Sequence, residues 1–128
     1  MALNYSKKTI NHFLNPKNIG EMKNPDGYSQ IGNMLCGDQL NFFLKVRNGK
    51  IKDVKFLSFG CASNIATASL LTEKVKGMTI AEAKKYKWET VVAELGGLPS
   101  QKIHCSVMAV EGFRKAIADY EKKQKHSR

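Results

Sequence analysis

The chain has 128 residues, of which 42% are hydrophobic and 25% charged, and its formal net charge is +10. This length suits one domain with a single hydrophobic core, and the composition excludes a disordered or fibrous chain. No apolar run approaches the roughly 20 residues that span a bilayer, and the N-terminal MALNYSKKTINHF lacks the apolar core of a secretory signal. We therefore expect a cytoplasmic protein with no membrane partner.

The N-terminal region is expected to contain one short helix followed by a loop. Residues 4–13 have a helical spacing that places Ile10 and Phe13 on one side. Residues 15–29 hold two prolines, two glycines and several Asn and Asp residues, which supply turn chemistry. A weakly patterned first strand is expected next, from Tyr28 to Leu35.

Two further strands are predicted around Asn48-Gly49, a dipeptide typical of a hairpin turn. The second strand reads as half-buried, with an apolar face at Leu40, Phe42, Leu44 and Val46. The third strand runs from about Ile51 to Phe59. A two-residue turn would place Leu44 opposite Asp53, whereas one more residue places Leu44 opposite Val54. We therefore expect a bulge or a three-residue loop at residues 48–50.

Beyond residue 61 the apolar spacing changes to that of helices. The first predicted helix ends near Gly77 and has its apolar face at Ile65, Ala68, Leu71 and Val75. A short helix begins at Thr79, where Glu82 completes a capping box, and another spans about residues 88–95. A long helix over about residues 106–123 carries one apolar stripe, formed by Val110, Phe113, Ile117 and Tyr120.

Strands followed by helices predict an α+β fold. We expect a small three-stranded antiparallel sheet with helices packed on one face and a long C-terminal helix. One domain is expected over residues 1–128. Within it, residues 1–27 form the N-terminal helix and loop, and residues 124–128 form a basic tail that frays.

Three cysteines lie far apart in the sequence, in the motifs CGD (36–38), FGCAS (59–63) and KIHCS (102–106). Cys36 falls at or just after the end of the first strand, Cys61 between the third strand and a helix, and Cys105 just before the long helix. Such junctions tend to collect binding residues. Two of the thiols lie at helix N-termini, where unpaired N–H groups lower a thiol pKa. An odd number of cysteines in a cytosolic chain favours free, metal-bound or reactive thiols over disulfides.

Polar residues beside these thiols extend the candidate site. Asp38 and His104 offer a carboxylate and an imidazole as metal ligands, and Lys102 is expected either to pair with Asp38 or to face water. Gly37 and Gly60 would let the backbone approach a bound group closely. Zinc accepts three thiolates with one oxygen or nitrogen ligand, and a [2Fe-2S] cluster takes four ligands, normally thiolates. The spacing does not choose between them, because no two cysteines form a close C-x-x-C motif.

Together, CGD, FGCAS and KIHCS resemble the IscU/NifU-N family of iron–sulfur cluster assembly scaffolds. The opening YSKKTINHFLNPKNIG and the late ADYEKK are similar to the same family, so the resemblance covers about residues 5–123. The three motifs follow the family's order at matching intervals, which makes the resemblance specific. The short interval between the second and third cysteines is similar to the IscU branch rather than the SufU branch.

The resemblance implies a scaffold rather than a turnover enzyme. A cysteine desulfurase of the IscS/NifS type would supply sulfur as persulfide, and Fe²⁺ and electrons would arrive from an iron donor or a ferredoxin. The [2Fe-2S] cluster would then pass to apo iron–sulfur acceptor proteins. By motif, Cys36, Cys61 and Cys105 are cluster ligands, with Cys105 as the persulfide acceptor. Asp38 and His104 are candidates for the fourth ligand position and for early iron binding.

Two further segments bear on partners. Tyr5 matches the family's N-terminal tyrosine, which is linked to persulfide reduction or dimer contact, and packing of the helix is an equally open role. The family's chaperone-binding segment LPPVK reads LPSQK at residues 98–102. Because the second proline and the valine are missing, recognition by a dedicated Hsp70-type chaperone stays open.

Three alternatives remain beside the scaffold. A small zinc-binding protein or zinc-dependent sulfur acceptor would use the same ligands, and the isolated protein could carry Zn²⁺. A basic nucleic-acid-binding domain fits the net charge, but the cations are spread out and the interleaved aromatic and basic strand pattern is missing. A thiol hydrolase using Cys105 with His104 is disfavoured, because adjacent side chains are expected to diverge.

Overall fold

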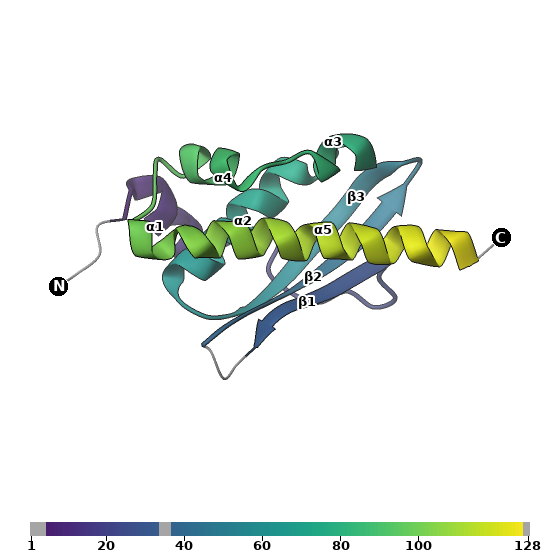
Figure 1. Cartoon of the computed structure of the whole chain (residues 1–128), viewed down its shortest axis with the longest axis horizontal. Coiled ribbons are helices and arrows are strands. Elements are labelled where there is room, and N and C mark those ends of the chain that lie inside the picture. Colours follow the sequence, from purple (N-terminus) through teal and green to yellow (C-terminus); the bar gives the residue numbers. More distant parts are fainter. Residues whose placement is uncertain (1–4, 34–36, 127–128) are drawn as a thin grey trace.

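A computed structural model describes residues 5–33 and 37–126 of the chain. Within these residues the elements are, in order, α1 (Lys7–Leu14), β1 (Gly27–Asn33), β2 (Asp38–Arg47), β3 (Lys50–Phe59), α2 (Ala62–Val75), α3 (Ile80–Lys84), α4 (Trp88–Glu94), a 3-10 turn (Ser100–Lys102) and α5 (Ile103–His126). The helices pack on one face of the sheet, and α5 runs along the length of the molecule (Figure 1). The predicted α+β fold is confirmed. No helix in the described part of the chain is long and apolar enough to cross a membrane.

The strands form an antiparallel sheet in the order β1-β2-β3. The predicted register is confirmed by the facing pairs Phe42 with Phe56 and Leu44 with Val54. The turn between β2 and β3 has two residues, Asn48 and Gly49, with positive φ angles of 55° and 73°. Positive φ at both positions is the geometry that fits a tight hairpin. The bulge lies at Lys52 in β3. Lys45 of β2 pairs with Asp53 and the next residue, Val46, pairs with Ile51, so Lys52 is the extra residue between them. A bulge was correctly expected, although it lies after the turn rather than within residues 48–50.

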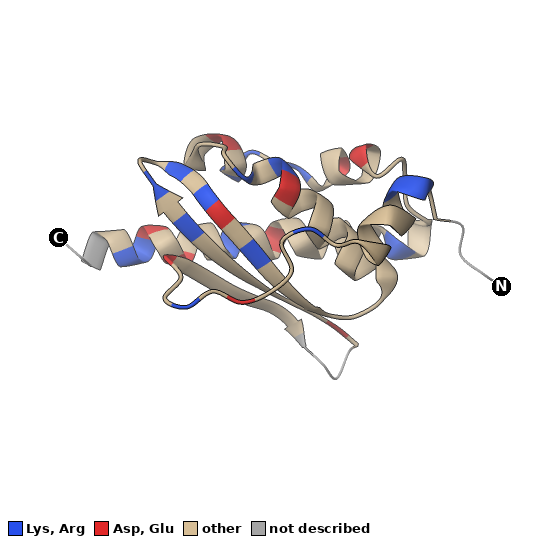
Figure 2. Cartoon of the chain, turned by 180° about the vertical axis from the view of Figure 1, so that it is seen from behind, with Lys and Arg blue, Asp and Glu red and all other residues tan. Residues whose placement is uncertain are grey.

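The prediction that β2 is half-buried is wrong, because both of its faces are covered from Gln39 to Leu44. As the central strand, β2 is paired on both edges. On its outer face the Phe43 ring contacts the Tyr28 ring at 5.1 Å between centroids. The segment between α1 and β1 first hydrogen-bonds to the backbone of Phe56 in β3. It then crosses the outer face of the sheet (Figure 2). The N-terminal segment therefore covers a face that alternation alone marks as exposed.

The helices confirm most of the sequence expectations. The stripe of α2 is buried at Ala68, Leu71 and Val75, and Thr79 and Glu82 form the expected capping box before α3. α5 begins at Ile103, a few residues earlier than expected, because the 3-10 turn leads directly into it. Cys105 therefore lies inside the first turn of α5 rather than ahead of it.

α1 packs against α2 through its polar side. Ile10 and Phe13 are 45% and 40% exposed, whereas Thr9 and His12 are buried. The His12 Nδ1 atom lies 2.7 Å from the Ser69 hydroxyl of α2. The apolar spacing of α1 thus marks an outward face, and hydrogen bonds hold the inward face.

Candidate metal centre

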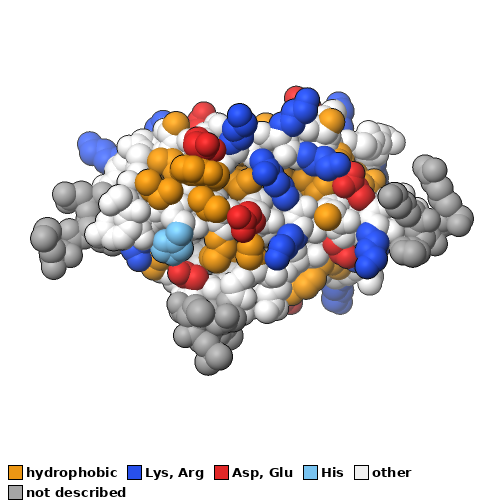
Figure 3. Space-filling model, viewed as in Figure 1, with side chains coloured by type: hydrophobic (Ala, Val, Ile, Leu, Met, Phe, Trp, Pro, Cys, Tyr) orange, Lys and Arg blue, Asp and Glu red, His pale blue; other side chains and the backbone are white. Residues whose placement is uncertain are grey.

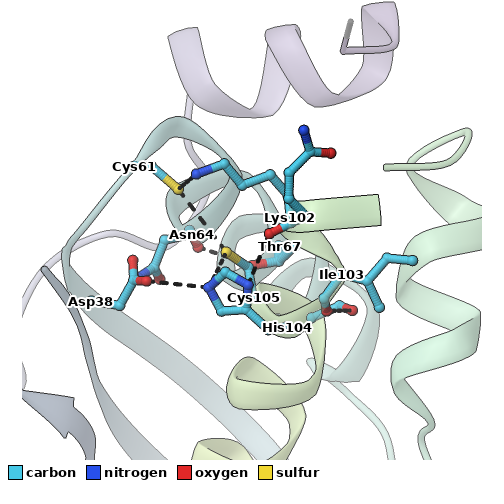
Figure 4. Close-up of polar contacts among 10 residues, drawn as sticks. Asp38, Cys61, Asn64, Thr67, Lys102, Ile103, His104 and Cys105 are labelled. Atoms are coloured by element: carbon cyan, nitrogen blue, oxygen red, sulfur yellow. Dashed lines mark hydrogen bonds and ion pairs between the residues drawn. The ribbon is translucent and has the colours of Figure 1, made fainter. Parts of the chain in front are cut away.

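Three elements begin at one point of the molecule, and each contributes one potential metal ligand. Asp38 opens β2, Cys61 is the N-cap of α2, and Cys105 lies in the first turn of α5. One carboxylate oxygen of Asp38 and the two sulfurs all lie within 4.8 Å of one another (Figure 4). The fold therefore brings together residues that are distant in the sequence. Cys36, the third predicted thiol, lies outside the described residues.

The two sulfurs differ in their surroundings. Cys61 Sγ lies 4.0 Å from Cys105 Sγ, and Cys61 is half-buried whereas Cys105 is fully buried. The Lys102 ammonium lies 3.6 Å from Cys61 Sγ. Negative charge on Cys61 is the main cause that raises the pKa of Lys102. Lys102 is half-exposed, and its ammonium contacts the Cys61 thiol, a partner that was not predicted.

Burial raises the pKa of the Cys105 thiol to about 12, and negative charge on Cys61 and Asp38 adds to the rise. The neighbouring Ser63 hydroxyl opposes part of it. The prediction that a helix N-terminus lowers this thiol pKa is wrong for Cys105, because loss of solvation outweighs the helix dipole. In the metal-free protein Cys105 is therefore a neutral thiol at physiological pH. A metal ion or a base must remove its proton before it can act as a ligand or nucleophile.

His104 is exposed, and its ring is shared among three groups. Nδ1 lies 3.1 Å from the Gln101 carbonyl oxygen, which can only accept, so Nδ1 carries a proton. Nε2 lies 3.3 Å from Asp38 Oδ2 and 3.7 Å from Cys105 Sγ. The neutral ring presents the Nε2 lone pair to the site, and the protonated ring donates to Asp38. The neutral form can therefore act as a metal ligand at this site, and the protonated form cannot.

The expectation that His104 and Cys105 diverge is wrong, because the imidazole folds back over the first turn of α5 toward the sulfur. A hydrolase is still disfavoured, for a different reason. A nucleophilic cysteine needs a lowered thiol pKa and access to substrate. Cys105 has a raised pKa and is fully buried.

Asn64 is a site residue that the sequence analysis did not identify. Its Nδ2 atom donates a hydrogen bond of 3.1 Å to Asp38 Oδ1. The sequence carried no signal that singled it out, because α2 also holds several Ser and Thr residues and two charged residues. Gly60 adjoins both side chains: a Cβ there would lie 2.6 Å from Asp38 Oδ1. Gly60 is therefore required for close approach to these two side chains, and the expected approach to a bound group stays a prediction.

Gly37 and Tyr5 have looser relations to the site. Gly37 has a φ of 79° and open space around its Cα, so this position needs glycine for its backbone conformation. Tyr5 is half-buried, and its pKa is raised first by burial and then by negative charge on Cys61. Tyr5 thus lies within electrostatic range of the thiols. Its predicted role in persulfide reduction or dimer contact stays a prediction.

The two ends of the molecule differ in charge on the face seen in Figure 3. On the face seen in Figure 3, apolar side chains gather over α4 and the first part of α5, and Lys and Arg side chains gather toward the opposite end. Two thiols, a carboxylate and an imidazole form a donor set that binds zinc or iron. The arrangement therefore suits capture of a thiophilic metal or a small iron–sulfur group at an accessible end of the fold.

Comparison with known proteins gives close relatives. Residues 4–127 match the family model described as the NifU-like N terminal domain. The iron-sulfur cluster assembly scaffold protein IscU 1 of Archaeoglobus fulgidus is 48% identical over 119 residues, covering 93% of this chain and 78% of the relative. The IscU scaffold protein of Escherichia coli is 44% identical over 124 residues, covering 94% and 96%. A crystal structure of a NifU-like protein N-terminal region from Brucella abortus has a TM-score of 0.75 at 20% identity, covering 92% and 94%.

Proposed function

Because this chain belongs to the family of NifU-like N-terminal domains, we propose that it is a scaffold on which an iron–sulfur cluster is assembled and then released. The observation that carries the proposal is the convergence of the Asp38 carboxylate and the Cys61 and Cys105 sulfurs within 4.8 Å. The relatives named as cluster assembly scaffolds support the same function. The whole chain is taken as one scaffold domain.

The proposed cargo is a [2Fe-2S] cluster, built from Fe²⁺ and sulfide. Cys36, Cys61 and Cys105 would supply thiolates, and Asp38 or His104 would complete the ligands. Thiolates are the usual ligands of such clusters, and one oxygen or nitrogen ligand departs from the four-thiolate set of electron-transfer proteins. We propose that this mixed set lets the cargo leave, because an oxygen ligand binds iron of the cluster less tightly than a thiolate does.

Sulfur is proposed to arrive from a cysteine desulfurase as a persulfide. The Cys105 thiolate would attack the outer sulfur, forming a new S–S bond, while the desulfurase cysteine leaves as a thiolate. Because Cys105 is buried and protonated in the metal-free protein, this step requires that docking of the desulfurase open the site and that the thiol lose its proton, which His104 Nε2, 3.7 Å away, is placed to accept. The more exposed Cys61, with the Lys102 ammonium at 3.6 Å, is the second thiol that could receive sulfur. Mapping persulfide by mass spectrometry in Cys61→Ser and Cys105→Ser proteins separates the two.

The other proposed partners are apo iron–sulfur proteins as acceptors, and an iron donor or ferredoxin as the source of iron or electrons. No catalytic turnover is proposed, because sulfur and iron leave as cargo rather than as a released small-molecule product. We place the protein in the cytoplasm, because its thiols must stay reduced to accept sulfur. The LPSQK segment leaves recognition by a chaperone open.

A zinc protein is the second candidate, because two thiols with a carboxylate and an imidazole also form a suitable zinc site. Both candidates use the same residues, so the metal retained under assembly conditions distinguishes them.

The test is anaerobic assembly of the cluster. The full chain is incubated with Fe²⁺, a thiol reductant, a cysteine desulfurase and cysteine, and the matched control omits cysteine. We expect visible absorption from sulfide-to-iron charge transfer only in the complete mixture, followed by activation of an apo-ferredoxin. A colourless protein that holds stoichiometric zinc throughout would reject the scaffold and favour the zinc protein.

A further inference from the structure

The side chain of Asn64 occupies an unusual place for an amide. Asn64 lies in the first turn of α2, three residues after the N-cap Cys61, and is 0% exposed. Its Nδ2 atom donates 3.1 Å to Asp38 Oδ1, which links the start of α2 to the start of β2 (Figure 4). This bond spans the two elements that present Cys61 and Asp38 to the site.

The other end of the same amide is unpaired. Asn64 Oδ1 is buried and has no hydrogen-bond partner among the described residues. A buried polar atom without a partner lowers the stability of a fold, so an apolar residue of similar shape would pack there at least as well. The amide is therefore poorly explained by folding stability. Among the described residues, the hydrogen bond to Asp38 is the interaction that its side chain makes.

The backbone around this bond is also shaped for it. A Cβ at Gly60 would lie 2.4 Å from Asn64 Nδ2 and 2.6 Å from Asp38 Oδ1, closer than real Cβ contacts allow. Any residue other than glycine at position 60 would push the amide and the carboxylate apart. Gly60 thus leaves the space in which the two groups meet.

The two oxygens of Asp38 have partners of different mobility. Oδ1 is bound by the buried Asn64, whereas Oδ2 lies 3.3 Å from Nε2 of His104, whose side chain is 56% exposed. An exposed imidazole can turn away when another group arrives, and a fully buried amide cannot. Oδ2 is therefore the oxygen that can be released to a metal while Oδ1 stays anchored.

We propose that Asn64 is a positioning residue that anchors Oδ1 of Asp38 and so presents Oδ2 as a preformed metal ligand beside Cys61 and Cys105. The proposal deepens the proposed function and rests on it, because it concerns the ligand that distinguishes this site from a four-thiolate one. Hydrogen-bond partners that orient metal ligands typically change metal affinity by about 10–100-fold. We expect an effect near the lower end of that range, because Asn64 orients only one of several ligands.

The test uses Co²⁺ as a spectroscopic stand-in for the physiological metal, bound anaerobically to the full metal-free chain. Asn64→Leu removes the donor while keeping a similar shape and adding no charge, and Asn64→Ala is a second variant in case leucine does not fit. Both are measured with and without Asp38→Ala. The matched control is Thr67→Val, which removes a buried bond of 3.0 Å to the Asn64 backbone carbonyl and leaves the Asp38 contact intact.

We expect Asn64→Leu to weaken Co²⁺ binding by about tenfold and to alter the visible d–d bands, while thermal unfolding of the metal-free protein is not lowered. In the Asp38→Ala background the same substitution has no further effect, and Thr67→Val leaves the Co²⁺ affinity unchanged. Wild-type affinity in both Asn64 variants would overturn the proposal. An equal loss with and without Asp38 would also overturn it, because the effect would then be structural.

The double-mutant cycle of Asn64 and Asp38 measures Co²⁺ binding and needs no cluster assembly. A chain that shows the expected coupling between Asn64 and Asp38 but builds no cluster with a desulfurase would defeat the proposed function and support the positioning role. A chain that builds a cluster but shows no such coupling would defeat only the positioning role.

Discussion

In the proposed site Asp38 is an oxygen ligand beside cysteine thiolates. The effect of this oxygen ligand on release of the cluster can be tested directly. We predict that Asp38→Cys, which replaces the oxygen ligand with a thiolate, slows transfer of the cluster to an apo-ferredoxin several-fold, because a four-thiolate site holds the cluster more tightly. The transfer rate is followed by circular dichroism of the acceptor, starting from equal cluster content. Wild-type transfer rates at equal content would show that Asp38 does not make the cluster labile.

The two described thiols should react at different rates. Burial raises the pKa of Cys105 to about 12, so only about one part in ten thousand is thiolate at pH 8. Cys61 is half-buried and has the Lys102 ammonium 3.6 Å from its sulfur. We predict that iodoacetamide labels Cys61 well before Cys105 in the metal-free protein at pH 8. The labelling rate of Cys105 should rise as the pH approaches 12.

The order in which iodoacetamide labels the two thiols is measured by quenching the reaction at set times and analysing the peptides by mass spectrometry. Labelling of Cys105 ahead of Cys61 would show that the buried site opens readily to solvent, and would contradict the raised pKa. Unfolded protein serves as the control, because both thiols then react with ordinary thiol pKa values.

At the scale of single residues, the sequence was sufficient to identify Asp38, Cys61, His104 and Cys105 as candidates, and the fold brings them together. It could not identify Asn64, because an amide acquires its role only from the carboxylate that packing places beside it. It also gave the wrong direction for the Cys105 pKa. Burial depends on how α2, α5 and β2 pack, and the helix dipole that local sequence suggests is the smaller effect.

The junction between α1 and α2 should make stability depend on pH. Burial lowers the pKa of His12, and the nearby cations Lys17 and Lys74 add to this, while Glu73 opposes it. The folded state thus binds the His12 proton less readily than the unfolded state, whose pKa is about 6.5. Stability from this residue is fully present above about pH 6.5 and is lost as the pH falls through the lower folded pKa.

We predict that His12→Gln reduces the loss of unfolding free energy between about pH 7 and about pH 5. Urea unfolding at both pH values measures it, and the neutral amide can still bond to the Ser69 hydroxyl. If the pH dependence is the same in both proteins, other groups carry it and His12 is not held neutral by burial. Because Glu73 opposes part of the shift in the His12 pKa, we expect only a modest effect.

β1 and α5 approach each other closely at Gly27. A Cβ there would lie 2.4 Å from the Ala116 carbonyl oxygen and 3.0 Å from Tyr120 Cβ, and a backbone oxygen within a helix cannot move aside cheaply. We predict that Gly27→Ala lowers the free energy of unfolding by about 1–3 kcal/mol, as other overpacked sites do. Co²⁺ affinity should stay unchanged, because the metal centre is built by other element ends. A protein of wild-type stability would mean that β1 shifts freely against α5.

At the scale of elements, periodicity and capping signals were most informative. They located α2, α3 and the register of β2 against β3, because these depend on neighbours in sequence or on a single facing strand. They failed for the outer face of β2, where cover comes from Tyr28 and the N-terminal segment. They also misplaced the start of α5, because the preceding 3-10 turn has no strong sequence signal.

At the scale of the whole molecule, the metal centre lies at one end and many of the positively charged residues lie elsewhere. Toward the hairpin end the strands hold several Lys and Arg residues with an acidic residue among them (Figure 2), whereas the metal centre lies where β2, α2 and α5 begin. The net charge of +10 therefore does not mark the metal centre. The overall fold was predictable because strands and helices are segregated along the chain, which few architectures other than α+β allow.

The most direct measurement is Mössbauer spectroscopy of the full chain after anaerobic assembly with ⁵⁷Fe, a desulfurase and cysteine. We predict a diamagnetic pair of ferric ions with two distinguishable quadrupole doublets, because one iron would be bound by thiolates alone and the other partly by Asp38 or His104. Iron and acid-labile sulfide should be present in equal amounts. Isolated paramagnetic iron, or a protein that retains zinc and no iron, would contradict the proposal that these residues hold one iron–sulfur cluster.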